Sequence, residues 1–446
     1  MVKSDNKYDA IVIGGGPAGL AEAYALKAAS KNVAVIENYQ WGGTCPNRGC
    51  DPKKMLLSGV QARDRIEQLQ GKGFSDIPWV NWTELETFKE TYTSKIPAGS
   101  RNGIVSAGIT AIDGEPKFIS TDQVEVNGEV YQADNFVIAT GQRPSRLNIT
   151  GKENLLTSTD FMNLKSMPKK IIFIGAGYIA FELATIASAT GAEVHIVHHN
   201  DRPLKEFDAS YVDELVKQLQ YRGINFHFNV DTKSIENNTK GYTLKADDFS
   251  LDSDLIVGAT GRIPNVEELA LDRANVKFDN KGIQTNDHLQ TTNPKIYAIG
   301  DVLDKVAPKL TPVAGFEASY VASVINGSQS HGIVYPAIPT LVYGGPELAK
   351  VGISTVEAKK DPDNYRVVDQ DLTKWFTYYR TSEHVAKAKV VFDNDDQIVG
   401  ATILSNEADE VINYLTIAIN KKMKHDKIAN TIFSYPTPAS DLEYLL

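Results

Sequence analysis

Residues 9–19 read DAIVIGGGPAG, a short apolar run that leads directly into a glycine-rich turn. The apolar run predicts a buried parallel strand, and the alanine-rich segment after the turn predicts a helix. Gly14 permits the tight turn, Gly16 lets the backbone approach a pyrophosphate, and Gly19 lets the helix pack closely on the strand. The next predicted strand ends at Glu37, whose carboxylate is placed to accept hydrogen bonds from a ribose diol. The segment therefore predicts a dinucleotide-binding unit with the phosphates at a helix N-terminus.

The same pattern recurs further along the chain. Residues 171–180 read IIFIGAGYIA, and His198 stands as far beyond Gly175 as Glu37 stands beyond Gly14. A carboxylate at this point would repel a 2′-phosphate, whereas imidazole and cationic side chains would attract it. We therefore expect NADPH rather than NADH, and the alternative is that these side chains are merely solvated. The group in question is His198, His199, Arg202 and Lys205.

Each unit closes with a similar segment, FVIATGQRP at 136–144 and LIVGATGRIP at 255–264. Repetition on this scale indicates two related dinucleotide-binding domains. Two such domains on one chain imply two dinucleotides side by side, one held and one exchanged.

The composition limits the class of protein. The chain has 446 residues, enough for about three domains, and its 42% hydrophobic and 23% charged residues are typical of a globular protein. The net charge of −10 argues against electrostatic binding to nucleic acid or to an anionic membrane. The first residues lack the layout of a signal peptide, and no apolar stretch is long enough to span a membrane. We expect a cytoplasmic protein with no nucleic-acid or membrane partner.

The chain contains only two cysteines, Cys45 and Cys50. A disulfide over so short a loop would constrain the unfolded chain little, and the local sequence lacks further zinc ligands. In a cytoplasmic protein such a pair is typical of a redox-active dithiol. We therefore predict a redox centre and no metal site, with a chance or structural pair as the alternative.

Two further segments complete the pattern, WGGTCPNRGCDPKK at 41–54 and YAIGD at 297–301. Together with the glycine motifs, they resemble the FAD-dependent pyridine nucleotide-disulfide oxidoreductases, a group that contains glutathione reductase, dihydrolipoamide dehydrogenase and mercuric reductase. The resemblance covers essentially the whole chain, and residues 175–182 are most similar to glutathione reductase. It implies an α/β fold with two Rossmann-like dinucleotide-binding domains and a C-terminal α+β dimerisation domain.

The resemblance implies that NADPH reduces FAD and that the flavin passes electrons to the Cys45–Cys50 disulfide. Cys50, nearest the flavin, would form the charge-transfer thiolate, and Cys45 would attack the substrate. A thiolate is stabilised by nearby positive charge and by a helix N-terminus. Arg48, Lys53, Lys54 and the helix predicted after the cysteines provide both.

Two further roles follow from the resemblance. Lys53 or Lys54 would pair with Glu182 beside the flavin, and the sequence leaves the choice of lysine open. Tyr178 would cover the flavin until the nicotinamide arrives, and the alternative is a tyrosine that only packs at the start of a helix.

The resemblance also assigns the cofactor ligands. Asp301 would bind the ribityl chain of FAD, Glu37 the adenosine ribose, and Gly114 would approach the adenine. A helix that begins at Thr311 would direct its N-terminus toward the flavin pyrimidine. The set expected for FAD is Gly14, Gly16, Pro17, Ala18, Gly19, Glu37, Gly43, Thr44, Gly114, Thr140, Gly141, Asp301, Thr311 and Pro312. The set expected for NADPH is Gly175, Gly177, Tyr178, Ile179, His198, His199, Lys205, Gly261 and Arg262.

One position departs from the family pattern. The family usually carries a C-terminal His-Pro-Thr segment, whose histidine shuttles protons with the interchange thiol across a dimer interface. Here Tyr435 precedes Pro436 and Thr437, and the acid that follows is shifted to Asp441. A neutral phenol is a poor base at neutral pH, because phenols titrate near pH ~10 whereas imidazole titrates near ~6.5. His425 is expected to be a surface residue rather than a substitute base.

Three functions are compatible with this departure. The first is reduction of a small disulfide such as glutathione disulfide, with Tyr435 steadying the thiolate and donating a proton. The second is reduction of a metal ion or quinone, as in the mercuric-reductase branch, although the C-terminal cysteine pair of that branch is absent. The third is a flavoprotein redox sensor of low turnover.

We favour the first function, performed by a homodimeric flavoprotein that passes electrons from NADPH through FAD and the Cys45–Cys50 pair to a small-molecule acceptor. The expected domains are residues 1–147 and 270–330 for FAD, 148–269 for NAD(P)H and 331–446 for dimerisation.

Overall fold

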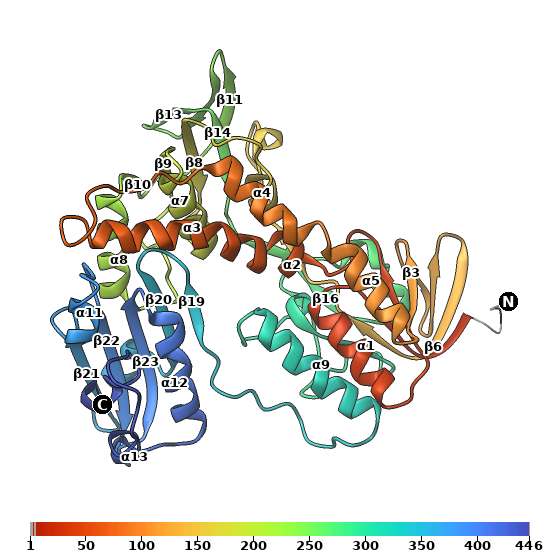
Figure 1. Cartoon of the computed structure of the whole chain (residues 1–446). Coiled ribbons are helices and arrows are strands. Elements are labelled where there is room, and N and C mark those ends of the chain that lie inside the picture. The colour runs from red at the N-terminus through yellow and green to blue at the C-terminus, as the bar shows by residue number, and fades with distance from the viewer. Residues whose placement is uncertain (1–2, 4–5, 446) are drawn as a thin grey trace. The chain divides into compact units, whose positions relative to one another are not determined.

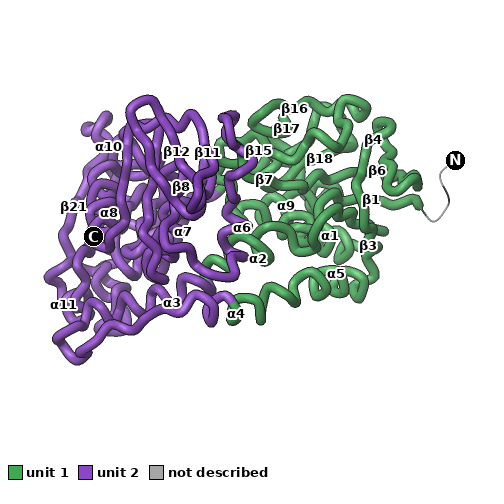
Figure 2. Tube along the Cα trace, turned by 90° about the horizontal axis from the view of Figure 1, so that it is seen from above, with its two compact units in different colours: residues 1–54, 87–145, 261–335 green, residues 55–86, 146–260, 336–446 purple. Residues whose placement is uncertain are grey.

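A computed structural model describes residue 3 and residues 6–445 of the chain. By its internal contacts the chain divides into two compact units, which Figure 2 shows in different colours. Unit 1 comprises residues 1–54, 87–145 and 261–335, and unit 2 comprises residues 55–86, 146–260 and 336–446.

Unit 1 is built on a seven-stranded sheet (Figure 1). Its strands in spatial order are β3 (Thr110–Asp113), β2 (Val33–Glu37), β1 (Lys7–Ile13), β6 (Glu129–Ile138), β5 (Gln123–Val126) and β4 (Lys117–Ser120), and β18 (Ile296–Ala298) also pairs with β6. Strands β3, β2, β1, β6 and β18 run parallel, whereas β4, β5 and β6 pair antiparallel. Two short ribbons pair β7 (Gln142–Pro144) with β15 (Arg262–Pro264) and β16 (Phe278–Asp279) with β17 (Gly282–Ile283).

The helices of unit 1 are α1 (Pro17–Ala28), α2 (Thr44–Arg48), α5 (Ile96–Ser106) and α9 (Thr311–Ile325). Helices α1 and α9 lie side by side (Figure 1). Helix α9 begins at the threonine where the sequence predicted a helix start. Two more helices, α3 (Cys50–Gln68) and α4 (Trp82–Thr93), each begin in one unit and end in the other.

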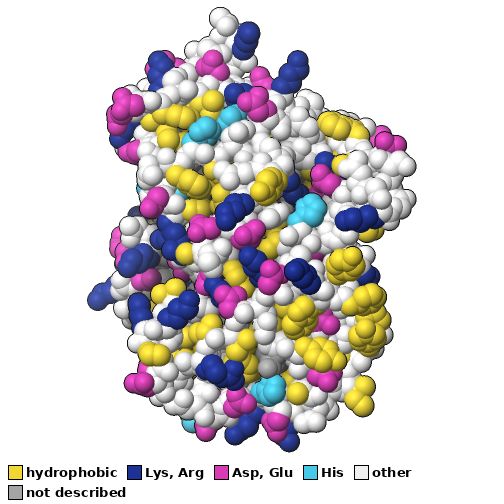
Figure 3. All heavy atoms as spheres, turned by 90° about the vertical axis from the view of Figure 1, so that its left-hand side faces the viewer, with side chains coloured by type: hydrophobic (Ala, Val, Ile, Leu, Met, Phe, Trp, Pro, Cys, Tyr) yellow, Lys and Arg dark blue, Asp and Glu magenta, His cyan; other side chains and the backbone are white. Residues whose placement is uncertain are grey.

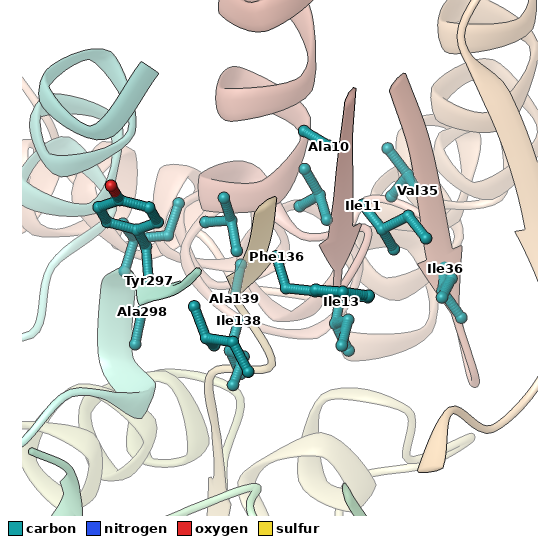
Figure 4. Close-up of a cluster of buried hydrophobic side chains, with 14 of the residues drawn as sticks. Ala10, Ile11, Ile13, Val35, Ile36, Phe136, Ile138, Ala139, Tyr297 and Ala298 are labelled. Atoms are coloured by element: carbon teal, nitrogen blue, oxygen red, sulfur yellow. The ribbon is translucent and has the colours of Figure 1, made fainter. Parts of the chain in front are cut away.

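The core of unit 1 lies between β1, β2, β6 and β18, whose apolar side chains meet in the buried cluster of Figure 4. Residues Ala10 to Ile13 of β1 are at most 1% exposed. A parallel strand covered on both faces needs apolar residues at every position, which explains the uninterrupted apolar run in the sequence.

The register of these strands brings distant residues to one edge of the sheet. Ile13 pairs with both Ile36 and Ile138, and Ile138 pairs with Ala298. Because the four strands run parallel and end at one level, the residues just beyond them emerge together. Glu37 is the last residue of β2, and the residues beyond the other three strands include Gly14, Thr140 and Asp301.

Unit 2 holds a parallel sheet and two antiparallel sheets. The parallel sheet is β10 (Ile224–His227), β9 (Glu193–Val197), β8 (Lys170–Ile174) and β14 (Leu255–Gly258). The smaller antiparallel sheet is β11 (Ser234–Asn238), β12 (Gly241–Lys245) and β13 (Ser250–Ser253). The larger one is β19 (Thr340–Val342), β20 (Glu347–Gly352), β23 (Ile398–Ser405), β22 (Lys387–Asp393) and β21 (Tyr365–Asp371).

The helices of unit 2 follow the same division. Helices α6 (Ser158–Met162), α7 (Tyr178–Ala189) and α8 (Ala209–Tyr221) belong to the part with the parallel sheet. Helices α10 (Thr355–Lys360), α11 (Phe376–Tyr379), α12 (Ala408–Asn420), α13 (His425–Ala429) and α14 (Leu442–Leu445) belong to the C-terminal part, where α12 packs on β20 and β23 (Figure 1). The predicted α/β class, with two Rossmann-like units and a C-terminal α+β part, is confirmed.

The duplication seen in the sequence is also present in the backbone. Gly14 has φ +114°, and a Cβ added there would lie 2.4 Å from the carbonyl oxygen of Ala139. Gly175 has φ +108°, and its added Cβ would lie 2.4 Å from the carbonyl oxygen of Ala259. Both turns therefore require glycine for the same two reasons, a positive φ and a close backbone contact.

Residues 55–86 belong to unit 2 by their contacts. Leu56, Leu57, Val60 and Trp82 lie in the buried apolar cluster that also contains Phe161. The predicted domain boundaries stay predictions.

The surface shows no segregation of charge on the face in Figure 3, where basic and acidic side chains are interspersed. Among the described residues, no helix is both long and apolar enough to cross a membrane.

Glu22 on α1 is a buried carboxyl group with 0% exposure, and among the described residues its two oxygens have no hydrogen-bond partner. Burial raises the pKa of Glu22 well above its usual value. The folded chain therefore retains a proton that the unfolded chain releases, so this group costs stability increasingly as the pH rises above the carboxyl's ordinary range.

We predict that Glu22→Gln stabilises the protein at pH 8 and that the gain shrinks as the pH falls to 5. Because the entropy of unfolding grows with chain length, each kcal/mol recovered should raise Tm by about 1 °C in a chain of 446 residues. Thermal unfolding from pH 5 to 8 measures the effect, with Glu115→Gln as the control because Glu115 is exposed. A difference that does not change with pH, or a less stable Glu22→Gln protein at pH 8, would contradict the assignment.

Candidate active site

The two cysteines lie on two consecutive helices. Cys45 is in the short helix α2, and Cys50 is the first residue of α3. The sequence predicted a single helix beyond the pair, and the structure instead starts α3 at Cys50 itself. This places the Cys50 sulfur at a helix N-terminus, where unsatisfied N–H groups favour negative charge. Both cysteines are free thiols.

The proton is shared unequally between the two sulfurs. A hydrogen bond from Cys45 is the largest influence on Cys50 and lowers its pKa to about 6. The same hydrogen bond raises the pKa of Cys45, and burial raises it further. At neutral pH the pair is therefore a Cys45 thiol that donates to a Cys50 thiolate.

Two other groups stabilise the Cys50 thiolate. The hydroxyl Oγ1 of Thr311, the first residue of α9, lies 3.8 Å from Cys50 Sγ, and the positive charge of Lys53 acts in the same direction. The sequence assigned Thr311 to the flavin alone, so its contact with the cysteine was missed. Arg48 was expected to help the thiolate, but its guanidinium donates to Gln40 and lies over the Tyr39 ring.

A carboxylate also faces the pair. Asp51 Oδ1 lies 3.9 Å from Cys45 Sγ, and Asp51 Oδ2 accepts a 2.9 Å hydrogen bond from the Tyr92 hydroxyl. Neither residue was predicted to belong to the site. Asp51 could have been predicted to belong to the site, because it is an acidic residue directly after Cys50. No sequence pattern predicts that Tyr92 contacts Asp51.

The first glycine turn of unit 1 touches the cysteine segment. A Cβ added to Gly43 would lie 2.5 Å from the Gly16 Cα atom, so Gly43 has no room for a side chain where the two backbones meet. Gly16 precedes α1, and no side-chain cap occupies the N-terminus of that helix. This bare cradle of N–H groups fits a dinucleotide pyrophosphate.

Other residues expected to hold FAD lie at the same sheet edge. Glu37 accepts hydrogen bonds from the N–H groups of Gly15 and Tyr39 at 2.6 and 2.8 Å, which fixes its carboxylate beside the turn. The N–H of Gly114 donates to the Glu37 carbonyl at 2.9 Å. Burial raises the pKa of Asp301, and nearby cations, including Lys305 and Arg262, oppose this rise.

All residues expected for FAD fall within unit 1, and those expected for NADPH divide between the units. Gly175, Gly177, Tyr178, Ile179, His198, His199 and Lys205 are in unit 2, whereas Gly261 and Arg262 are in unit 1. Arg262 pairs through β15 with β7, and its guanidinium donates to the Gln142 carbonyl at 2.6 Å.

The second glycine turn has the features of the first. Helix α7 begins at Tyr178 after Gly177, and no side-chain cap occupies its N-terminus. Tyr178 is half-exposed, and Glu182 one turn later is buried and accepts a 3.0 Å hydrogen bond from the Tyr343 N–H. The pairing of Glu182 with Lys53 or Lys54 stays a prediction.

The side chains expected to bind a 2′-phosphate differ in their charge. Burial lowers the pKa of His198, which favours the neutral form of this imidazole. Arg202 donates to the Phe207 carbonyl at 3.0 Å, and both Arg202 and Lys205 are exposed. Positive charge near this turn therefore comes from Arg202 and Lys205.

The substitute for the family's C-terminal histidine lies on the surface of unit 2. Tyr435 is 73% exposed, whereas Asp441 is 8% exposed, so the two side chains face different environments. Burial raises the pKa of Asp441.

Two dinucleotide-binding units and a thiol–thiolate pair define a dithiol oxidoreductase that uses bound nucleotides. The chain belongs to the pyridine nucleotide-disulphide oxidoreductase family, which residues 8–318 match, and residues 338–445 match the family's dimerisation domain. This confirms the resemblance drawn from the sequence. The family is FAD-dependent and uses a pyridine nucleotide, so the chain is a flavoprotein oxidoreductase with a disulfide redox centre.

Named relatives span almost the whole chain. It is 30% identical to a dihydrolipoyl dehydrogenase of Bacillus subtilis (strain 168), with 96% of this chain and 93% of that protein aligned. It is 29% identical to a glutathione reductase of Burkholderia cepacia, with 97% of each aligned. Its fold matches the HOCl-induced flavoprotein disulfide reductase RclA from Escherichia coli at a TM-score of 0.90 and 23% identity, covering 98% of this chain and 99% of RclA.

We predict that Thr311→Val raises the pKa of Cys50 by about one pH unit, because a hydrogen bond to a charged group contributes roughly 1.5–3 kcal/mol. The pH dependence of Cys50 alkylation by iodoacetamide measures this in the reduced protein. Thr311→Ser is the matched control, since it keeps the hydroxyl and should keep the pKa of Cys50. An unchanged pKa in Thr311→Val would remove Thr311 from the thiolate site.

Proposed function

We propose that this chain is an NADPH-dependent reductase of a small disulfide, of the glutathione disulfide type, and that it acts as a homodimer. The observation that carries the proposal is the placement of Cys50 at the N-terminus of α3, with Thr311 Oγ1 3.8 Å from its sulfur and Cys45 in the preceding helix α2. Disulfide reduction needs one sulfur that stays charged for the flavin and another that attacks the substrate. The two cysteines have these separate properties.

When bound, the two nucleotides would supply hydride transfer from the pyridine nucleotide and electron transfer from the flavin to the cysteine pair. The side chains of this protein would control the protonation of the two cysteines. Thr311 and Lys53 keep negative charge on Cys50. Cys45 remains a thiol until it is deprotonated for attack, which limits unproductive reaction of the resting dithiol.

The preference for NADPH rests on Arg202 and Lys205. Their exposed cations can pair with a 2′-phosphate, and no carboxylate stands where Glu37 stands in the first unit. The similarity to the glutathione reductase of Burkholderia cepacia supports a glutathione-type acceptor. The dimerisation domain supports the homodimer.

The test is a screen of NADPH oxidation with glutathione disulfide, lipoamide, quinones and metal ions as acceptors, each repeated with NADH. We predict turnover of a small disulfide, a higher kcat/KM with NADPH, and loss of disulfide reduction in Cys45→Ser by at least 100-fold. Quinone reduction should persist in Cys45→Ser, because a quinone takes electrons without thiol attack. Metal-ion or quinone turnover with no disulfide turnover would support the second function instead, and an NADH preference would overturn the cofactor assignment.

A further inference from the structure

The carboxylate of Asp51 occupies a position that the proposed function does not yet explain. It lies in the first turn of α3, with one oxygen 3.9 Å from Cys45 Sγ and the other held by Tyr92 of α4 at 2.9 Å. The N-terminus of a helix favours a carboxylate, so the position itself is stable.

The negative charge of Asp51 nevertheless disfavours the thiolate form that Cys45 needs for nucleophilic attack. The negative charge of Asp51 contributes to raising the pKa of Cys45 and opposes the lowering of the pKa of Cys50. The other titratable groups that face this site are Lys53 from α3 and Tyr92 from α4, and Thr311 faces it from α9. A carboxylate that acts only by its charge would therefore slow the attack of Cys45 on a disulfide.

Thiol–disulfide exchange also needs a proton carrier. The thiol of Cys45 must lose a proton before attack, and the first thiolate that leaves must gain one. In the family this is the task of a C-terminal histidine, and Tyr435 stands in its place. The S–H of Cys45 can turn from the Cys50 sulfur to Asp51 Oδ1, which lies 3.9 Å from Cys45 Sγ and offers a direct path for this proton.

We propose that Asp51 is the proton carrier of the interchange thiol Cys45 and that Tyr92 is the residue that positions it. This inference rests on the proposed function, because it requires a disulfide substrate.

The S–H bond of Cys45 breaks and Asp51 takes the proton, while the Cys45 sulfur attacks one sulfur of the substrate. The substrate S–S bond breaks, its electron pair leaves with the second sulfur, and Asp51 returns the proton to that thiolate. The Cys50 thiolate then attacks Cys45, a Cys45–Cys50 disulfide forms, and the second product thiolate takes a proton from solvent. The dithiol is oxidised by two electrons and the substrate is reduced by two.

The experiment separates the two halves of turnover in the FAD-loaded enzyme. Anaerobic mixing with NADPH follows the appearance of the long-wavelength absorbance that a thiolate gives beside a flavin. Mixing the reduced enzyme with glutathione disulfide follows its loss. In Asp51→Ala we expect the second rate to fall on the order of 100-fold, with partial recovery in formate or acetate, and the first rate to fall much less.

A second readout distinguishes proton transfer from a purely electrostatic effect. Removing the charge should make Cys45 more acidic, so its alkylation by iodoacetamide at pH 7 should become faster while disulfide reduction becomes slower. Asp51→Asn, which has nearly the same shape, provides the same comparison if Asp51→Ala does not fold. Asp51→Glu should recover part of the lost rate.

The positioning role of Tyr92 has a matched control. Tyr131 donates to Glu129 at 3.0 Å, a pair of the same chemistry on β6 that lies outside the site. Tyr92→Phe should slow the reaction with glutathione disulfide about 10-fold without recovery in formate and should change its pH profile. Tyr131→Phe should change neither.

Two results would overturn the inference. One is an Asp51→Ala enzyme that reduces glutathione disulfide as fast as wild type or faster, and the other is a slower enzyme that neither formate, acetate nor Asp51→Glu restores. If instead wild type gives no long-wavelength absorbance with NADPH, the proposed function fails and the inference fails with it.

Discussion

Parallel strands that end in register are the constraint on which the site of unit 1 depends. The pairing of Ile13 with Ile36 and Ile138, and of Ile138 with Ala298, sets four strand ends at one level. Everything that follows those ends, including the Gly14 turn and Asp301, is positioned by buried apolar side chains rather than by the polar residues themselves. The same constraint operates in unit 2, where Ile174 pairs with Val197 and with Gly258. In both units, buried apolar residues that take no part in the reaction therefore set the positions of the residues expected to bind the nucleotides.

The segment that carries the two cysteines lies directly against the first glycine turn of this sheet. Gly43 has no room for a side chain where it meets Gly16, so the redox segment lies against the turn that the phosphates are expected to occupy. The start of α3 at Cys50 and of α9 at Thr311 then brings helix N-termini to the thiolate. Helix ends, one hydroxyl and one cation together favour negative charge on Cys50 while Cys45 keeps its proton.

The strands, the glycine turns and the start of α9 could be predicted from the sequence, because each depends on a local sequence pattern. The apolar runs, the glycine turns and the start of α9 all depend on residues within about one helix length of each other. Contacts between distant segments could not be predicted this way. Thr311 reaches Cys50 and Tyr92 reaches Asp51 only because helices from different parts of the chain meet, and no spacing in the sequence records that. The lowered pKa of His198 was missed for a related reason, since it depends on burial.

A single titration tests whether Cys45 and Cys50 share one proton unequally. The FAD-loaded enzyme, reduced by two electrons, is titrated from pH 8 to pH 4.5 while its long-wavelength thiolate–flavin absorbance is followed. We expect the absorbance to be half lost at about pH 6, where Cys50 takes up its proton. Half loss at or above the ordinary thiol value, about 8.5, would contradict it.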